Sequence, residues 1–242
     1  MSFRRLISVG ALAASAAVLP ALPGQAAPST GHCPNPNYPT NSSTITLSVS
    51  PRTVTAGRSV SAFGELRKNS CAIKGATIRI ARKRVVNGVA TGGWMRVASV
   101  TTDRNGLYLA SIVPPHNELL RARFAGTSDG TFKPATSGNV RISVRTKITE
   151  AATKGSACRI TLTGATRPVK GHHTVTIQKR GAKGHFHGWS KFATGKTGKR
   201  GHYSITKTAN CGTTYNLSAF IAKDATNLSG RSATIFGIKA TH

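Results

Sequence analysis

The feature that most constrains the fold of this chain is an internal repeat with a period of about 95 residues. The segment Gly93-Trp94-Met95-Arg96-Val97-Ala98 returns 95 positions later as Gly188-Trp189-Ser190-Lys191-Phe192-Ala193, and Gly106-Leu107-Tyr108 returns as Gly201-His202-Tyr203. A period of this length indicates a duplicated domain, because the repeating unit of a solenoid is much shorter. We therefore expect two domains of similar fold, at residues 44–146 and 147–242.

Each half of the chain consists of short segments in which apolar and polar residues alternate. The apolar positions lie in the segments 45–49, 76–80, 108–112, 120–124 and 140–144, and again in 158–162, 175–177, 203–205 and 215–219. A period of two with one apolar face is typical of half-buried antiparallel strands. About seven such strands in roughly 100 residues predict a β-sandwich for each domain, so the expected fold class is all-β.

The N-terminus has the pattern of an export signal. Arg4 and Arg5 precede an apolar stretch that runs to Leu22, and small residues stand at the positions expected for cleavage after Ala26. The alternative, a membrane anchor, is disfavoured because Pro20 and Pro23 interrupt the stretch. We expect a signal peptide at 1–26, an extended arm at 27–43 and an extracellular mature protein; the general and twin-arginine export routes both stay open.

Four cysteines fit an oxidising compartment. Cys33 and Cys71 lie in the first half of the chain, and Cys158 and Cys211 lie in the second. Of the three pairings that four cysteines allow, we favour Cys33–Cys71 and Cys158–Cys211, because domains usually fold as units. Zinc is the competing interpretation, but the chain contains no Cys-x-x-Cys pair.

The first half of the chain contains a series of short motifs, namely Ser50-Pro51 with Val54 and Ala56-Gly57, then Gly75-Ala76-Thr77-Ile78, Trp94, Thr102-Asp103 with Gly106 and Tyr108, Arg121-Ala122-Arg123-Phe124-Ala125-Gly126, and Pro134-Ala135-Thr136-Ser137. Together these motifs resemble the immunoglobulin-like repeats of secreted actinobacterial proteins. The resemblance implies two tandem Ig-like antiparallel β-sandwiches. In the second half it is weaker, since Gly198 replaces Asp103 and the segment 216–219 stands where 121–124 stood. Such domains serve mainly as spacers or adhesive modules, and the resemblance transfers no catalytic residue.

The aromatic residues at equivalent positions are predicted to be structural. We expect Trp94 and Trp189 to pin the core or its rim, although an aromatic face could also stack on a sugar. Tyr108 and Tyr203 are expected in the core with their hydroxyl groups at the sheet edge. The segment 103–106 contains Asn-Gly and is predicted to form a turn, since it lacks the further acidic ligands of a calcium loop.

Nothing in the sequence indicates catalysis. The chain has only six carboxylates, which are scattered, and no motif of a serine hydrolase, a zinc protease or a phosphate-binding loop. We therefore expect a non-enzymatic protein without cofactor or small-molecule substrate. His185 and His187 are weak candidates for a metal site, but neighbouring lysines oppose a bound cation.

Positive charge is the main clue to function. The whole chain has 34 Lys and Arg residues against six Asp and Glu, a formal charge of +28, and both predicted domains share this excess. Outward strand positions of the first domain are often arginine, namely Arg79, Arg121, Arg123, Arg141 and Arg145. The densest cationic run, which we take as the candidate polyanion site, comprises Lys179, Arg180, Lys183, Lys191, Lys196, Lys199 and Arg200.

A charge this large exceeds what solubility requires and favours attraction to polyanions. Because the protein is expected to be exported, the fitting partners are wall teichoic acid, an acidic polysaccharide, extracellular DNA or an anionic membrane surface. Two other functions stay open: a structural or protein-interaction module whose charge is incidental, and a secreted cationic inhibitor or antimicrobial effector.

Overall fold

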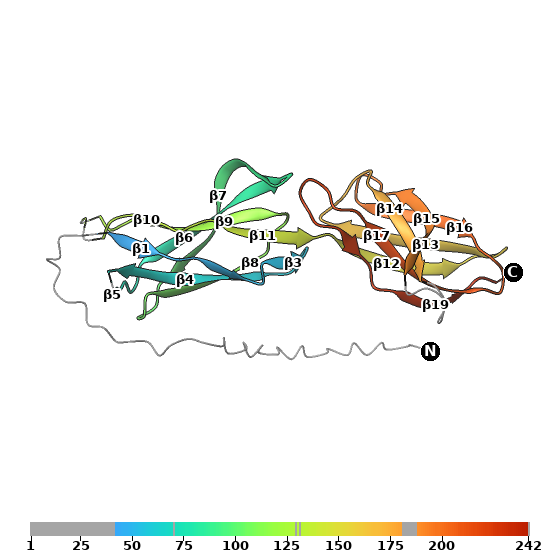
Figure 1. The fold of residues 1–242 in the computed structure, drawn as a ribbon, viewed down its shortest axis with the longest axis horizontal. Helices are drawn as coiled ribbons and strands as arrows, with labels where there is room; N and C mark the ends of the chain where they lie inside the picture. Colours follow the sequence, from blue (N-terminus) through green and yellow to red (C-terminus); the bar gives the residue numbers. More distant parts are fainter. Residues whose placement is uncertain (1–41, 70, 129, 131, 181–187, 242) are drawn as a thin grey trace, which may run out of the picture. The chain divides into compact units, whose positions relative to one another are not determined.

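A computed structural model of the chain describes residues 42–69, 71–128, 130, 132–180 and 188–241. Its first eleven strands, in the part we call the first repeat (residues 43–145), form two sheets (Figure 1). One sheet contains β1 (Ser43–Ile45), β2 (Ser48–Ser50), β4 (Val60–Lys68), β5 (Cys71–Ala72) and β8 (Leu107–Ile112). The other contains β3 (Thr53–Thr55), β6 (Thr77–Val86), β7 (Val89–Thr101), β9 (Glu118–Phe124), β10 (Ala135–Thr136) and β11 (Val140–Arg145).

The remaining strands, in the part we call the second repeat (residues 147–239), also form two sheets. The smaller sheet has the order β12-β13-β16, with β12 (Lys147–Lys154), β13 (Arg159–Arg167) and β16 (His202–Thr208). The larger sheet has the order β15-β14-β17-β18, and β19 also pairs with β17. Its strands are β14 (Thr174–Arg180), β15 (Trp189–Lys196), β17 (Thr214–Ile221), β18 (Gly230–Arg231) and β19 (Ile235–Lys239).

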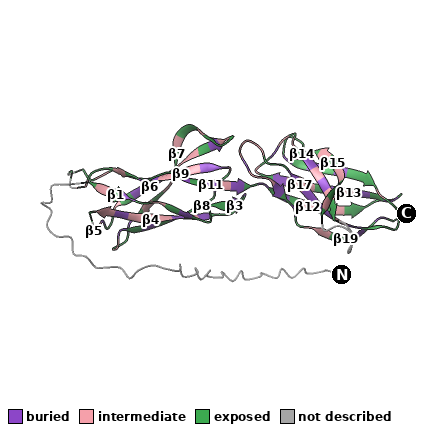
Figure 2. Cartoon of the chain, viewed as in Figure 1, coloured by how far each residue is buried: buried purple, intermediate pink, exposed green. Residues whose placement is uncertain are grey.

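The two-residue alternation of the sequence places one face of each strand in a core. In β9, for example, Leu120, Ala122 and Phe124 are buried, and in β14 Val175 and Ile177 are buried. Figure 2 shows this alternation as purple and green segments along neighbouring strands. The buried residues form one apolar cluster per repeat, so the all-β sandwich class predicted from periodicity is confirmed.

Three details of the sheets differ from the prediction. Several strands were not predicted, among them β4, β7, β12 and β15, and Trp94 and Trp189 lie in β7 and β15. The strand β3 pairs in parallel with β11, whereas the other strand pairs are antiparallel. The edge strands β7 and β15 each contain a bulge: in β7, Val97 has no partner between the pairs Ile80–Ala98 and Ala81–Arg96.

The same bulge occurs in the second repeat, where Phe192 has no partner between the pairs Ile177–Ala193 and Gln178–Lys191. A bulge lets two successive side chains point to one face. Accordingly Phe192 and Ala193 both pack against the core of the second repeat. The two repeats therefore share this bulge as well as the sequence motifs.

In each repeat a buried tyrosine reaches over the middle strand of its own sheet to the backbone on the other side, over β4 in the first repeat and over β13 in the second. The hydroxyl of Tyr203 donates a hydrogen bond to the carbonyl oxygen of Thr149 over 3.0 Å, and the hydroxyl of Tyr108 donates to the carbonyl oxygen of Thr46. Both tyrosines are buried, as the sequence predicted, and burial raises the pKa of both hydroxyls. A β-carbon at Gly164 would lie 2.5 Å from the Tyr203 hydroxyl, so glycine leaves the space that this contact needs.

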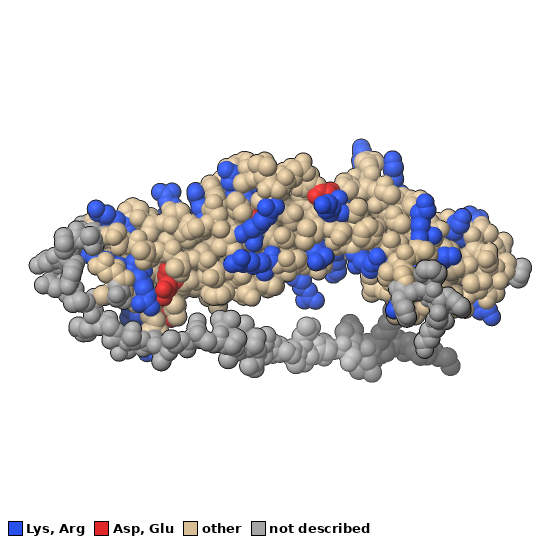
Figure 3. Space-filling model, viewed as in Figure 1, with Lys and Arg blue, Asp and Glu red and all other residues tan. Residues whose placement is uncertain are grey.

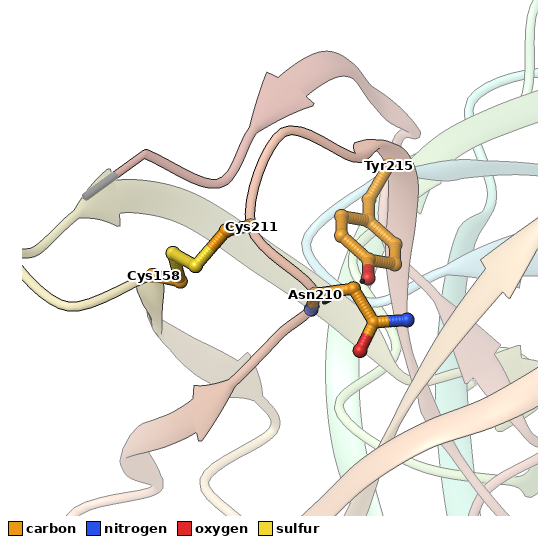
Figure 4. The surroundings of a disulfide bond; sticks show 4 residues. All are labelled: Cys158, Asn210, Cys211 and Tyr215. Atoms are coloured by element: carbon orange, nitrogen blue, oxygen red, sulfur yellow. Dashed lines mark hydrogen bonds between the residues drawn. A yellow bond between two sulfur atoms is a disulfide. The ribbon is translucent and has the colours of Figure 1, made fainter.

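Cys158 and Cys211 form a disulfide, as predicted, with their α-carbons 5.2 Å apart (Figure 4). Close to it, the backbone N–H of Asn210 donates to the hydroxyl of Tyr215 over 3.1 Å. Cys71 lies half-buried in β5, but Cys33 lies outside the described residues, so the pairing Cys33–Cys71 stays a prediction.

The expected signal peptide at 1–26 and nearly all of the expected arm at 27–43 also lie outside the described residues, and β1 begins at Ser43. In the part of the chain that the structure describes, we find no helix long and apolar enough to span a membrane.

Removing the disulfide tests how much it stabilises the second repeat. The two cysteines are 53 residues apart, and in the chain-entropy model a loop of that length contributes about 4 kcal/mol. We expect the double variant Cys158→Ser, Cys211→Ser to lose roughly this free energy of unfolding. Urea unfolding followed by Trp189 fluorescence in a Trp94→Phe background measures this repeat alone. An unchanged midpoint would contradict the assigned role of the disulfide.

Candidate functional site

Five arginines project from the outer side of one sheet of the first repeat, and we call them the arginine face. They come from β6, β7, β9 and β11, and they are Arg79, Arg96, Arg121, Arg123 and Arg141. Their neighbours along each strand explain their direction: Ile78 and Ile80 flank Arg79, and both are fully buried. Arg121 is half-buried and the other four are exposed, as the alternation predicted for Arg79, Arg123 and Arg141.

The sheet register brings these like charges close together. Arg79 is directly paired with Arg123 across β6 and β9, and Arg121 lies two positions along β9 on the same side. The bulge at Val97 returns Arg96 to this side, opposite Ala81, which is in turn paired with Arg121. Like charges directly opposite one another in a sheet are destabilising. The arginine face therefore holds an electrostatic cost that a bound anion would relieve.

The carboxylates of the described residues lie outside the arginine face, and other groups of the fold surround them. Glu65 pairs with Arg67 at 2.9 Å, the Asp224 carboxylate accepts from the ammonium of Lys170, and Asp103 accepts two backbone N–H bonds in its turn. Glu150 accepts hydrogen bonds from Ser232 and from the backbone N–H of Ala219. Among the described residues, no arginine of the face belongs to an ion pair. In the space-filling view, blue cations outnumber red carboxylates widely (Figure 3).

A tryptophan lies within the arginine face. The guanidinium carbon of Arg121 is 3.9 Å from the centre of the Trp94 ring, a short cation–π contact. Both side chains are half-buried, and neither Trp94 nor Trp189 belongs to the core cluster of its repeat. The structure therefore does not place these tryptophans in the core, and Trp94 lies against Arg121 on the outer side of its sheet.

A hollow of about 350 Å³ adjoins the arginine face at Arg79. Lys74, Phe124 and Phe132 contribute to its lining, and the Lys68 ammonium lies 5.4 Å from the centre of the Phe132 ring. The volume falls within the range of small-molecule sites. Cations and aromatic side chains together make it suited to one residue of an anionic polymer.

The cationic run predicted in the second repeat does not form one cluster. Lys179, Arg180 and Lys191 lie at one end of the β14–β15 pair, where Arg180 is paired with Trp189. Lys196 lies at the other end, about 17 Å along the strand, and Lys199 and Arg200 follow it in a turn. These six side chains are exposed, and Lys183 lies outside the described residues. The predicted site is thus divided between the two ends of the strand pair.

The candidate metal ligands His185 and His187 also lie outside the described residues. In the ranges that are described, no group of three or more His, Cys, Asp or Glu side chains could hold a metal ion. His173 instead contacts the Gly171 carbonyl oxygen at 2.9 Å and the Asp224 carboxylate at 3.4 Å.

A buried carboxylate lies beneath the sheet at the start of β9. Glu118 is fully buried, and neither of its carboxylate oxygens has a hydrogen-bond partner among the described residues. A nitrogen atom of the Arg82 guanidinium and a ring nitrogen of His116 each lie 3.9 Å from a carboxylate oxygen of Glu118. Burial raises the pKa of Glu118 to about 7, although Arg82 lowers it. No feature of the sequence predicted this group.

Neither a protein-family model nor a curated protein matches the chain. Among solved structures, it is similar to a tetra-tandem repeat in the extending region of a large adhesion protein, with 16% identity and a TM-score of 0.36 over 80% of this chain and 49% of that chain. It is also similar to the Yersinia pseudotuberculosis adhesin InvE, with 16% identity and a TM-score of 0.35 over 78% and 58%.

A further similarity is to red sea bream transglutaminase, with 16% identity and a TM-score of 0.34 over 81% of this chain and 31% of that chain. The chain thus spans between 31% and 58% of the length of these three structures. Identities and TM-scores this low assign the chain to no family, and the resemblance to actinobacterial Ig-like repeats stays a prediction.

Replacing one partner of the Arg79–Arg123 pair tests the electrostatic cost of the arginine face. We expect Arg79→Thr to raise the free energy of unfolding by about 0.5 kcal/mol at low salt, because it removes a like charge and introduces a good strand residue. Screening should shrink this gain at 0.5 M salt. The matched control Arg52→Thr changes an exposed arginine next to β3. A gain of equal size at both salt concentrations would argue against repulsion.

Glu118→Gln tests the buried carboxylate. Since the folded-state pKa of about 7 lies above the ordinary value of 4.5, the folded protein binds this proton more tightly than the unfolded chain does. The folded state therefore becomes more stable as the pH falls from 7 towards 4.5. The free-energy cost of burying the ionised carboxylate is fully present above pH 7. We expect the variant to be more stable than wild type by roughly 1–3 kcal/mol at pH 8.

This advantage should vanish near pH 4.5. The measurement is chemical unfolding of both proteins across this pH range. The pKa of His116 is lowered by burial and by Arg84, but His116 is present in both proteins, so its own contribution largely cancels in the difference. A difference in stability that does not change with pH would contradict the raised pKa.

Proposed function

We propose that this protein is an exported, non-enzymatic Ig-like repeat protein that binds an anionic polymer of the cell envelope or the extracellular matrix. The single observation that carries the proposal is the arginine face, where five guanidinium groups share one side of a sheet without a carboxylate partner among the described residues. The predicted signal peptide supports export, and the disulfide Cys158–Cys211 suits an oxidising compartment.

The physical basis of binding is the exchange of small counterions for the protein. A linear polyanion holds condensed cations along its length, and arginine side chains that neutralise its charges release them into solution. The large net charge of +28 attracts such a polymer from a distance and accelerates encounter. The arginine face then supplies several contacts spread over four strands, which matches an extended chain better than a compact ligand.

The cations of the second repeat add to this attraction. Lys179, Arg180 and Lys191 form one exposed group, and Lys196, Lys199 and Arg200 form another. Their separation along the sheet suits a long polymer more than a single small anion. In this proposal, the partner is a wall teichoic acid, an acidic polysaccharide or extracellular DNA, and an anionic membrane surface offers the same charges.

A salt series tests this function. With long-chain polyphosphate as the probe, we expect the affinity to fall by roughly two to three orders of magnitude between 50 and 200 mM salt if about five charges are neutralised. The triple variant Arg79→Gln, Arg121→Gln, Arg123→Gln should lower the slope of log affinity against log salt by about two. Fluorescence anisotropy of labelled polyphosphate measures both quantities.

The control replaces three exposed arginines outside the face, namely Arg52, Arg58 and Arg104, with glutamine. This variant has the same net charge as the face variant but should keep the wild-type slope within a few tenths. Equal losses in the two variants would contradict the arginine face as the site. Binding by the wild-type protein that is insensitive to salt would contradict the electrostatic function itself.

A further inference from the structure

In each repeat the guanidinium group of an arginine lies over the ring of the half-buried tryptophan. In the first repeat, the guanidinium carbon of Arg121 lies 3.9 Å from the centre of the Trp94 ring. In the second, that of Arg231 lies 4.5 Å from the Trp189 ring and 5.5 Å from the Phe220 ring. The two tryptophans occupy equivalent positions of the duplicated sequence.

The two arginines, in contrast, do not occupy equivalent positions. Arg121 comes from the middle of β9, whereas Arg231 comes from the short strand β18. In the second repeat, the register places Ser218 at the position of Arg121, because Ala122 pairs with Ile80 and Ala219 pairs with Ile177, so the sequence alignment of 121–124 with 216–219 was wrong by two residues. Duplication of the sequence alone therefore does not account for the arginine on the second tryptophan. The two repeats place an arginine on the equivalent tryptophan from two different strands.

Stacking prepares a guanidinium group to bind an oxyanion. The ring contacts the flat face of the group and leaves its edge, which carries the N–H donors, free to point elsewhere. A stacked arginine also loses less side-chain freedom when it binds, because its position is already fixed. Half-burial of Arg121 raises the electrostatic strength of any hydrogen bond it makes to an anion.

The neighbours of Arg121 favour a tetrahedral anion over a planar one. Arg123 lies two positions along the same strand, and Arg79 is directly opposite Arg123 on a strand about 4.8 Å away. A carboxylate has two oxygens, and a single guanidinium fork can occupy both. The two or three non-bridging oxygens of a phosphodiester or sulfate ester are arranged tetrahedrally, so they point in different directions and can receive hydrogen bonds from two or three guanidinium groups at once.

From these contacts we infer that the arginine face selects tetrahedral oxyanion esters, phosphate or sulfate, over carboxylates, and that Arg121, held by Trp94, is the selecting residue. This inference rests on the proposed function, since it names the class of polymer that the cationic surface binds. Arg231 on Trp189 is the corresponding anchor of the second repeat. The recognition lies in the geometry of the guanidinium group, and net charge alone does not provide it.

The experiment compares Arg121→Lys with wild type in the full-length mature protein. Lysine keeps the charge but lacks the planar fork, so simple attraction to a polyanion would be unchanged. We expect the affinity for polyphosphate and for dextran sulfate to fall about tenfold, whereas binding of polyglutamate changes less than twofold. The control Arg52→Lys should bind all three probes as wild type does.

Trp94→Leu provides a second variant, because it removes the ring and leaves every charge in place. It should reproduce the selective tenfold loss, and thermal unfolding shows whether it is folded under the assay conditions. The wild-type protein should prefer polyphosphate and dextran sulfate to polyglutamate at equal charge. The relative affinity for polyphosphate and dextran sulfate then identifies phosphate or sulfate as the natural group.

Two results would overturn the inference: Arg121→Lys binding polyphosphate as tightly as wild type does, or wild type binding polyglutamate as tightly as the other probes. In both cases a steep salt dependence would still support the electrostatic function proposed above. Failure of that function has a different signature, which is the absence of salt-sensitive binding to all three polymers.

Discussion

This protein has too few acidic side chains to neutralise the basic side chains on its surface. The chain has 34 cationic residues and six acidic ones, and the five described acids are held in turns, sheet contacts or the interior. The arginines of the arginine face that alternate with core residues on β6, β9 and β11 therefore have no carboxylate partner among the described residues. A folded chain arranged in this way is stabilised by whatever polyanion neutralises it, so binding and stability are linked.

The core could be predicted from sequence because burial follows a period of two. Leu120, Ala122 and Phe124 alternate with arginines, and that pattern alone specifies which side of β9 faces inward. The strands β7 and β15 were missed for two reasons. Glycines interrupt the apolar pattern in or just before them, namely Gly92 and Gly93 for β7 and Gly184 and Gly188 for β15. A bulge also breaks the two-residue alternation, at Val97 in β7 and at Phe192 in β15. The parallel pairing of β3 with β11 depends on chain path, which no local pattern records.

The candidate site was only partly predictable for a related reason. Alternation identified Arg79, Arg121 and Arg123 as outward residues, but only the register between strands shows that Arg79 opposes Arg123. Density of charge along the chain favoured the run that begins at Lys179, and the strand pair separates that run into two groups. The stack of Arg121 on Trp94 joins residues 27 positions apart, so it required the sheet to be seen. Glu118 gave no signal, because its burial depends on the strands around it.

The most direct test of the central claim is to observe the arginine side chains during binding. The Nε–Hε signals of the arginines can be followed by NMR in the full-length protein as a short polyphosphate is added. If the arginine face is the binding site, the signals of Arg79, Arg121 and Arg123 should move first and furthest, with that of Arg121 the most strongly shifted. Signals that move uniformly across the protein, or mainly those of Arg180 and Arg200, would contradict it.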